Sequence, residues 1–83
     1  MRSNNRFRIC NNSAKPLELY IEPEGACYLL EKGQEVSVLD VFTTAPVTVM
    51  IATNDSGDPY ISIWPGDGEV KVEKDGVDVL DIP

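Results

Sequence analysis

Short runs of β-branched and aromatic residues, each closed by turn-forming residues, fill nearly the whole chain. The runs are residues 6–11, 17–22, 26–30, 35–42, 47–53, 60–64, 69–74 and 77–80. They recur about every ten residues, and no stretch keeps the 3.6-residue apolar period of a helix. This spacing is typical of small sandwiches and barrels. We therefore predict an all-β fold, a small antiparallel β-sandwich or barrel of seven or eight short strands.

Alternation within the runs predicts which side chains face the core. In 17–22 the apolar residues Leu17, Leu19 and Ile21 are expected to face inward, and Glu18, Tyr20 and Glu22 outward. The run 47–53 is the most apolar and is expected at the centre of a sheet. Val38-Leu39 interrupts the alternation of 35–42, which predicts burial on both faces or a bulge.

Two turns carry specific sequence signals. Asp75-Gly76 between alternating runs is the strongest short-range signal for a hairpin. Residues 31–34 are expected to form a second hairpin turn, in which Gly33 supplies a positive φ.

The length and composition indicate one globular domain. The chain has 83 residues, of which 42% are hydrophobic and 25% charged. We expect residues 1–5 to form a flexible arm and residues 6–83 a single β domain. The basic N-terminus is not followed by an apolar segment, and the longest apolar-rich run, 47–52, is too short to span a bilayer. These features predict a cytoplasmic protein, with Cys10 and Cys27 as reduced, buried thiols.

The charge is unevenly distributed and limits the classes of partner. Residues 1–15 hold four basic and no acidic side chains, whereas residues 16–83 hold three lysines and all 14 acids. The net charge of −7 disfavours nucleic acid and anionic membrane surfaces but is compatible with a basic protein partner. The alternative is that acids on exposed strand faces only prevent aggregation.

The residue types argue against catalysis. The sequence contains no histidine, so the usual general base and the commonest metal ligand are missing. We predict that the protein is not an enzyme and expect no cofactor or metal. Residues 54–58 loosely resemble a calcium loop, and a weak site would need Asp67 nearby. A plain turn is the favoured interpretation.

Aromatic residues mark the candidate binding surface. Tyr60, Ser62 and Trp64 share one strand face, and Tyr20 and Tyr28 lie in strands that could extend it. Exposed aromatic side chains are good anchors for a protein partner or a sugar. The candidate partner-binding residues are therefore Tyr60, Trp64, Tyr20 and Tyr28. The alternative for Trp64 is that it covers the end of the core.

These observations favour a small non-catalytic protein-interaction or accessory module. The second hypothesis is a module that binds a small molecule, sugar or cation through loops 54–59 or 65–68, which lie at opposite ends of strand 60–64. A third is self-association through a strand edge, which Arg8 and Lys71 would discourage. The sequence does not predict the oligomeric state.

Residues 14–33 also carry a family resemblance. The pattern comprises Lys15-Pro16-Leu17, Glu22-Pro23-Glu24-Gly25, Tyr28-Leu29-Leu30 and Gly33, followed later by Ile63-Trp64-Pro65-Gly66. It resembles a group of small uncharacterised bacterial all-β proteins, a domain of unknown function. The position after Pro23, often aromatic in that group, is Glu24 here. The resemblance implies the fold rather than a role.

Overall fold

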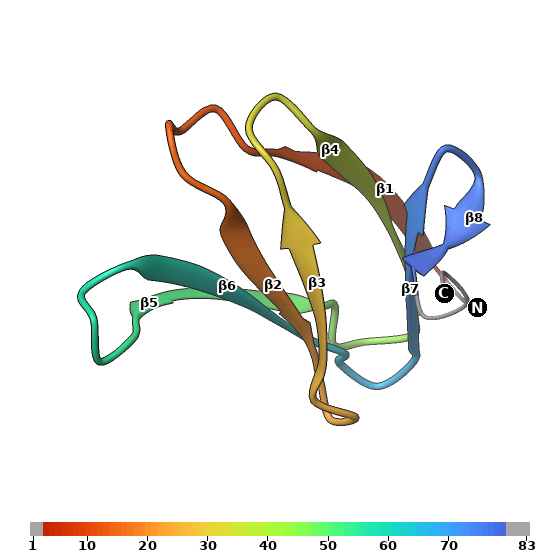
Figure 1. Cartoon of the computed structure of the whole chain (residues 1–83). Coiled ribbons are helices and arrows are strands. Elements are labelled where there is room, and N and C mark those ends of the chain that lie inside the picture. The colour runs from red at the N-terminus through yellow and green to blue at the C-terminus, as the bar shows by residue number, and fades with distance from the viewer. Residues whose placement is uncertain (1–2, 80–83) are drawn as a thin grey trace.

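The computed structural model describes residues 3–79, which form eight strands and no α-helix (Figure 1). The strands are β1 (Ser3–Cys10), β2 (Leu17–Ile21), β3 (Ala26–Leu30), β4 (Glu35–Phe42), β5 (Thr48–Thr53), β6 (Pro59–Trp64), β7 (Glu69–Lys74) and β8 (Val77–Asp78). Each predicted run contains one strand, so the all-β prediction is confirmed. Residue 80, the predicted end of the last strand, lies outside the described residues.

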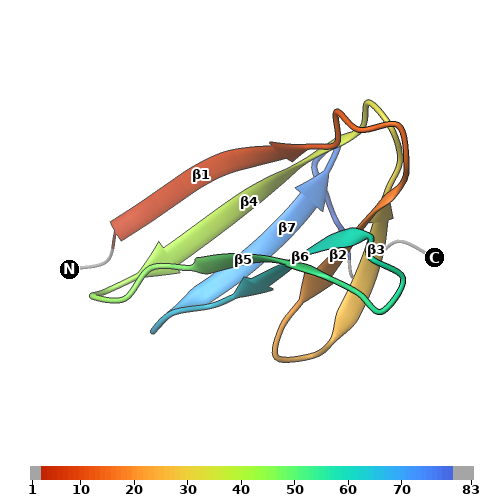
Figure 2. The same cartoon turned by 90° about the vertical axis from the view of Figure 1, so that its left-hand side faces the viewer.

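The strands form two four-stranded sheets. Sheet A has the order β1-β4-β7-β8 and sheet B the order β3-β2-β6-β5, which makes the fold a sandwich rather than a closed barrel (Figures 1 and 2). Neighbouring strands are antiparallel except β2 and β6, which run parallel. In sheet B the hairpins β2–β3 and β5–β6 thus meet side by side through β2 and β6. The prediction of a wholly antiparallel fold is wrong for this pair.

The core lies between the two sheets and is aliphatic. Its buried side chains are Leu19, Ile21, Leu30 and Ile63 from sheet B, Val36, Val38 and Val72 from sheet A, and Val79 after β8. Burial of Leu19 and Ile21 confirms the predicted faces of 17–22. In β4 Val36, Val38 and Asp40 are buried on one face, whereas Ser37, Leu39 and Val41 on the other face are only half-buried. The register with β1 and β7 is continuous, so no bulge forms at Val38-Leu39, and the predicted burial on both faces is also wrong.

One of the two predicted hairpin turns is confirmed and the other is wrong. Asp75 and Gly76 both have positive φ and join the paired strands β7 and β8, which confirms the hairpin. Residues 31–34 also turn, with Gly33 at φ +81°, but they carry the chain from sheet B to sheet A. The predicted second hairpin is wrong because turn residues specify a local bend and not the sheet that the next strand joins.

Buried Asn11 holds this corner together. Its Nδ2 donates to the carbonyl oxygens of Lys15 and Leu30, each at 2.8 Å, and its Oδ1 accepts from the Ser13 amide. The Gly33 amide donates to the Asn11 carbonyl at 2.7 Å. Every polar atom of the Asn11 side chain thus has a partner, which removes the cost of its burial.

Two strands differ from their predicted positions. Residues 3–5, expected in a flexible arm, pair with residues 40–42 of β4, and residues 1–2 lie outside the described part. β5, predicted at a sheet centre, is an edge strand of sheet B. The apolar composition of β5 did not predict its burial, because Val49, Met50 and Ile51 are exposed on the two faces of the strand.

A tight contact joins the two connections that cross between the sheets next to β5 and β6. The Asp67 carboxylate accepts hydrogen bonds from the amides of Thr43, Thr44 and Ala45 at 2.7–3.0 Å, and the Asp67 amide donates to the Ala45 carbonyl. A Cβ on Gly66 would lie 1.8 Å from the Ala45 oxygen, and one on Gly68 1.8 Å from the Val41 oxygen. We call residues 65–68 with residues 41–46 the crossover contact.

Substitution of Gly68 should test the crossover contact. Gly68→Ala is expected to lower the free energy of unfolding by about 3 kcal/mol or more, because the added Cβ would overlap the backbone of Val41 and force it to shift. Gly33→Ala is the matched control. Its Cβ would meet nothing within 4 Å, so only the left-handed φ is penalised, by about 1–2 kcal/mol. Urea unfolding measures both, and equal losses would contradict the steric argument.

Asp67 should contribute to acid sensitivity. The amides of Thr43, Thr44 and Ala45 lower the pKa of its carboxyl group. A lowered pKa means that Asp67 stabilises the fold above its unfolded-state pKa of about 3.9 and loses that contribution as the pH falls through the folded value. The stability difference between wild type and Asp67→Asn should therefore be largest near neutral pH and shrink below about pH 4. Denaturant titrations across this range, with Glu24→Gln as an exposed control, measure it; a pH-independent difference would contradict it.

Candidate functional site

The candidate site lies on the outer face of sheet B, which points away from the core. Tyr20 of β2 and Tyr60 of β6 meet there edge to face, with ring centroids 5.5 Å apart and planes at 79°. The parallel register places them together, because Tyr20 pairs with Ser62 and Glu18 with Tyr60. Edge-to-face packing of this kind stabilises two aromatic rings beyond their burial.

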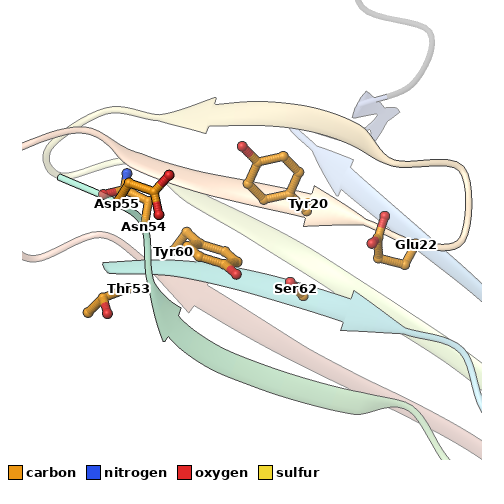
Figure 3. A pocket seen from close by; sticks show the side chains of 7 residues that line it. All are labelled: Tyr20, Glu22, Thr53, Asn54, Asp55, Tyr60 and Ser62. Atoms are coloured by element: carbon orange, nitrogen blue, oxygen red, sulfur yellow. The ribbon is translucent and has the colours of Figure 1, made fainter. Parts of the chain in front are cut away.

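The two tyrosines line a hollow of about 430 Å³. The other lining residues are Glu22, Thr53, Asn54, Asp55 and Ser62. Figure 3 shows Glu22 at one end and Asn54 with Asp55 at the other, with the rings between them. The hollow thus combines aromatic surface with two carboxylates, and no basic side chain of the described residues lines it.

Glu18 supports this surface from beside Tyr20. The Tyr20 hydroxyl donates to Glu18 Oε2 at 3.0 Å, and Asn54 Nδ2 lies 3.5 Å from Glu18 Oε1. The bond to Glu18 is the main cause that raises the pKa of Tyr20 to about 12, because ionised tyrosine would lose the donor and face a carboxylate. The bond to Glu18 thereby keeps Tyr20 protonated to a higher pH and fixes its ring.

Polar groups of loop 54–58 bond to one another and to Lys15. Asn54 Oδ1 accepts from the amides of Ser56 and Asp58, and Asp58 forms an ion pair with Lys15 at 3.3 Å. Asp67 belongs to the crossover contact beyond the other end of β6, so it does not complete a calcium loop. Within residues 3–79 no three His, Cys, Asp or Glu side chains are grouped to share a metal ion. The arrangement is that of a turn.

The four predicted binding residues do not form one surface. Tyr20 and Tyr60 are in contact, and Trp64 lies at the far end of β6 on the same strand face, 40% exposed. Tyr28 instead packs against the core, because it pairs with buried Leu19 and shares its inner face. Its predicted place in the aromatic surface is wrong.

Glu22 was not predicted as a site residue, and loop 54–59 was predicted only as the binding loop of the second hypothesis, separate from the tyrosines. Alternation did place Glu22 outward, beside Tyr20 on the same face. The missing information was the β2–β6 register, which brings loop 54–55 to the same tyrosines. Residues so far apart in sequence cannot be joined by local patterns.

The expected burial of the cysteines is wrong. Cys10 and Cys27 are free thiols, as expected, but both are exposed rather than buried. Among the acids, Asp40 is buried, and its Oδ2 accepts from the Val47 amide at 2.9 Å. Its Oδ1 is buried without a hydrogen-bond partner among the described residues. Asp40 therefore anchors the entry to β5 at the cost of one unsatisfied oxygen.

Comparisons with known proteins add no identification: no protein family, curated protein or solved structure matched the chain. The resemblance of residues 14–33 to bacterial all-β proteins stays a prediction. The described part of the chain contains no helix long and apolar enough to cross a membrane.

Glu18→Gln should change the titration of Tyr20. In the wild type one tyrosine should ionise near pH 12, and in Glu18→Gln its pKa should fall towards the ordinary value of about 10. Because the pKa is raised on folding, Tyr20 stabilises the fold below pH 10 and loses this contribution as the pH rises through 12. Phenolate absorbance, with Tyr20→Phe to identify the signal, measures the shift. An unchanged Tyr20 titration in Glu18→Gln would contradict it.

Proposed function

We propose that the protein is a small non-catalytic binding module that receives a basic segment of a partner protein on the outer face of sheet B. The observation that carries this proposal is the hollow itself. Tyr20 and Tyr60 lie between Glu22 and Asp55, and none of the basic side chains in residues 3–79 lines the space. A lysine or arginine of a partner would supply the missing positive charge.

The chemistry of the hollow suits a cationic side chain. A cation over a tyrosine face gains roughly 0.5–1 kcal/mol at an exposed site, and up to about 2 when it is desolvated. Glu22 and Asp55 add charge-assisted hydrogen bonds, which an arginine can form in pairs. The net charge of −7 attracts a basic segment before contact and raises its association rate.

The strand face favours a peptide segment over a compact ligand. Trp64 lies four residues beyond Tyr60 on β6, about 13 Å away at 3.3 Å per residue, and is 40% exposed. An extended segment along β6 would place one basic side chain at the tyrosines and an apolar one at Trp64. Exposed tryptophan and tyrosine are frequent anchors in protein interfaces.

Two further observations support a non-catalytic role and a cytoplasmic location. The sequence lacks histidine, so the hydroxyl groups of Ser62 and Thr53 in the hollow have no imidazole base to activate them, which supports a role without catalysis. Cys10 and Cys27 are exposed and unpaired, which is the expected state in the reducing cytoplasm.

Titration with a defined peptide tests the proposal. A peptide of alternating arginine and leucine should bind, shift the amide resonances of Tyr20, Glu22, Asp55 and Tyr60, and lose affinity as salt is added. Tyr60→Leu should weaken binding about two- to fivefold, which corresponds to an exposed cation–π contact.

A charge-matched variant separates the hollow from the general acidity of the chain. Glu22→Gln and Glu31→Gln remove the same charge, but Glu31 lies in the exposed connection between β3 and β4. Only Glu22→Gln should weaken the peptide. Equal effects of the two variants, or resonance shifts spread over all acidic residues, would contradict the proposed site.

A further inference from the structure

The free edge of β5 is the most exposed apolar part of the described chain. β5 is the last strand of sheet B and runs along its open side (Figures 1 and 2). Val49, Met50 and Ile51 are exposed, and Ile51 reaches 76%. Ile51 pairs with Ile61 of β6 and so faces the same side as the core, but sheet A does not extend over it. An unpaired apolar edge of this kind is a template for another strand.

The charge distribution indicates which strand would pair there. Residues 41–54 and 59–66 hold no charged side chain, although the net charge is −7. The other edges are different: β1 carries Arg6 and Arg8, β8 has two residues, and the chain around β3 carries Glu24 and Glu31. β8 pairs only with Glu73 and Lys74, so among the described residues Lys71 lies on the part of β7 that β8 does not cover. A charged partner would find no complement at β5, whereas a second copy would meet no like charge.

Backbone hydrogen bonds determine which groups of β5 are free. The Asn54 amide donates to the Asp58 carbonyl at 2.8 Å, so Asn54 points towards the β6 side. Antiparallel pairs alternate, so Thr48, Met50 and Ala52 also bond to β6, while Val49, Ile51 and Thr53 point outward. The partner of Thr53 is Pro59, which has no amide hydrogen, and this agrees with the assignment.

One self-complementary register uses the free groups of all three outward residues, Val49, Ile51 and Thr53. We propose that β5 pairs antiparallel with β5 of a second copy about a two-fold axis at Ile51. Ile51 then pairs with Ile51 of the second copy, and Val49 with its Thr53. Each pair exchanges two hydrogen bonds, about six in all. A register centred on Met50 would instead need the Val47 amide, which already donates to Asp40.

Pairing in this register joins the two copies of sheet B into one continuous sheet. The Ile51 side chains meet at its centre, in the space that sheet A leaves uncovered. Two chains of net charge −7 repel each other, so added salt strengthens the dimer by screening this repulsion. Salt should weaken peptide binding to the hollow but strengthen the dimer. The two proposals can therefore fail independently, and the salt dependence shows which one has failed.

Sedimentation equilibrium tests the dimer. The wild type should show a concentration-dependent mass that rises from 9.1 kDa towards twice that value, and more steeply at high salt. Ile51→Lys and Ile51→Glu should each be monomeric, because like charges meet on the axis, and a mixture of the two should form a heterodimer. Val77→Lys adds the same charge at an exposed apolar position of β8 and should leave the dimer intact.

The opposite results would overturn the proposal. These are a wild-type mass of 9.1 kDa at the highest attainable concentration in low and high salt, or a mixture of the two Ile51 variants that stays monomeric.

Disulfide crosslinking tests the register. In a Cys10→Ser, Cys27→Ser background, Ile51→Cys should form a covalent dimer with oxidised glutathione, because paired Cα atoms lie about 5.5 Å apart, within disulfide range. Met50→Cys is the matched control: Met50 is also exposed but pairs with Ala52 of the second copy. Crosslinking of Met50→Cys as efficient as that of Ile51→Cys would overturn the register.

Discussion

The crossover contact is the interaction on which the positions of β5 and β6 depend. Two of the connections between the sheets, β4–β5 and β6–β7, are joined by Asp67 through the amides of Thr43, Thr44 and Ala45. Gly66 and Gly68 let the two backbones approach more closely than any side chain would permit. Buried Asp40 adds a bond to the Val47 amide just before β5. Because the core is small and aliphatic, apolar packing alone does not specify where β5 and β6 lie, and these polar bonds fix their positions.

The candidate site follows from this arrangement. Once β6 is placed beside β2 in parallel, Tyr60 meets Tyr20 and loop 54–55 completes the hollow. Glu18 fixes the Tyr20 hydroxyl and Asn54 holds the loop, so the surface is organised before any partner arrives. The two proposals assign different parts of the same sheet by their electrostatics. In them the acidic hollow would bind a basic segment, and the uncharged edge would pair with a second copy. Since the two-fold axis is perpendicular to the sheet, both hollows of a dimer would open on one face, where they could bind two segments of one partner.

Sequence reasoning was most accurate where the physics is local. Alternation predicted that Leu19 and Ile21 face the core while Glu18 and Tyr20 face outward, and Asp75-Gly76 predicted its hairpin. These features depend on side-chain direction and φ preference, which neighbouring residues determine. The site was predicted in part: Tyr20, Tyr60 and Trp64 lie on one face, whereas Tyr28 lies on the other.

The all-β class, the extent of most strands and the side of the sheet on which most side chains lie all follow from local sequence patterns. The pairing of strands in three dimensions was needed to establish that 31–34 is a corner and not a hairpin, that β5 is an edge, and that β2 and β6 are parallel. It was also needed to establish that Asp40 is buried. The physical reason is that strand pairing joins residues far apart in the chain. Turn residues and hydrophobic alternation specify each strand and each bend, but they carry no information about which strand becomes the neighbour.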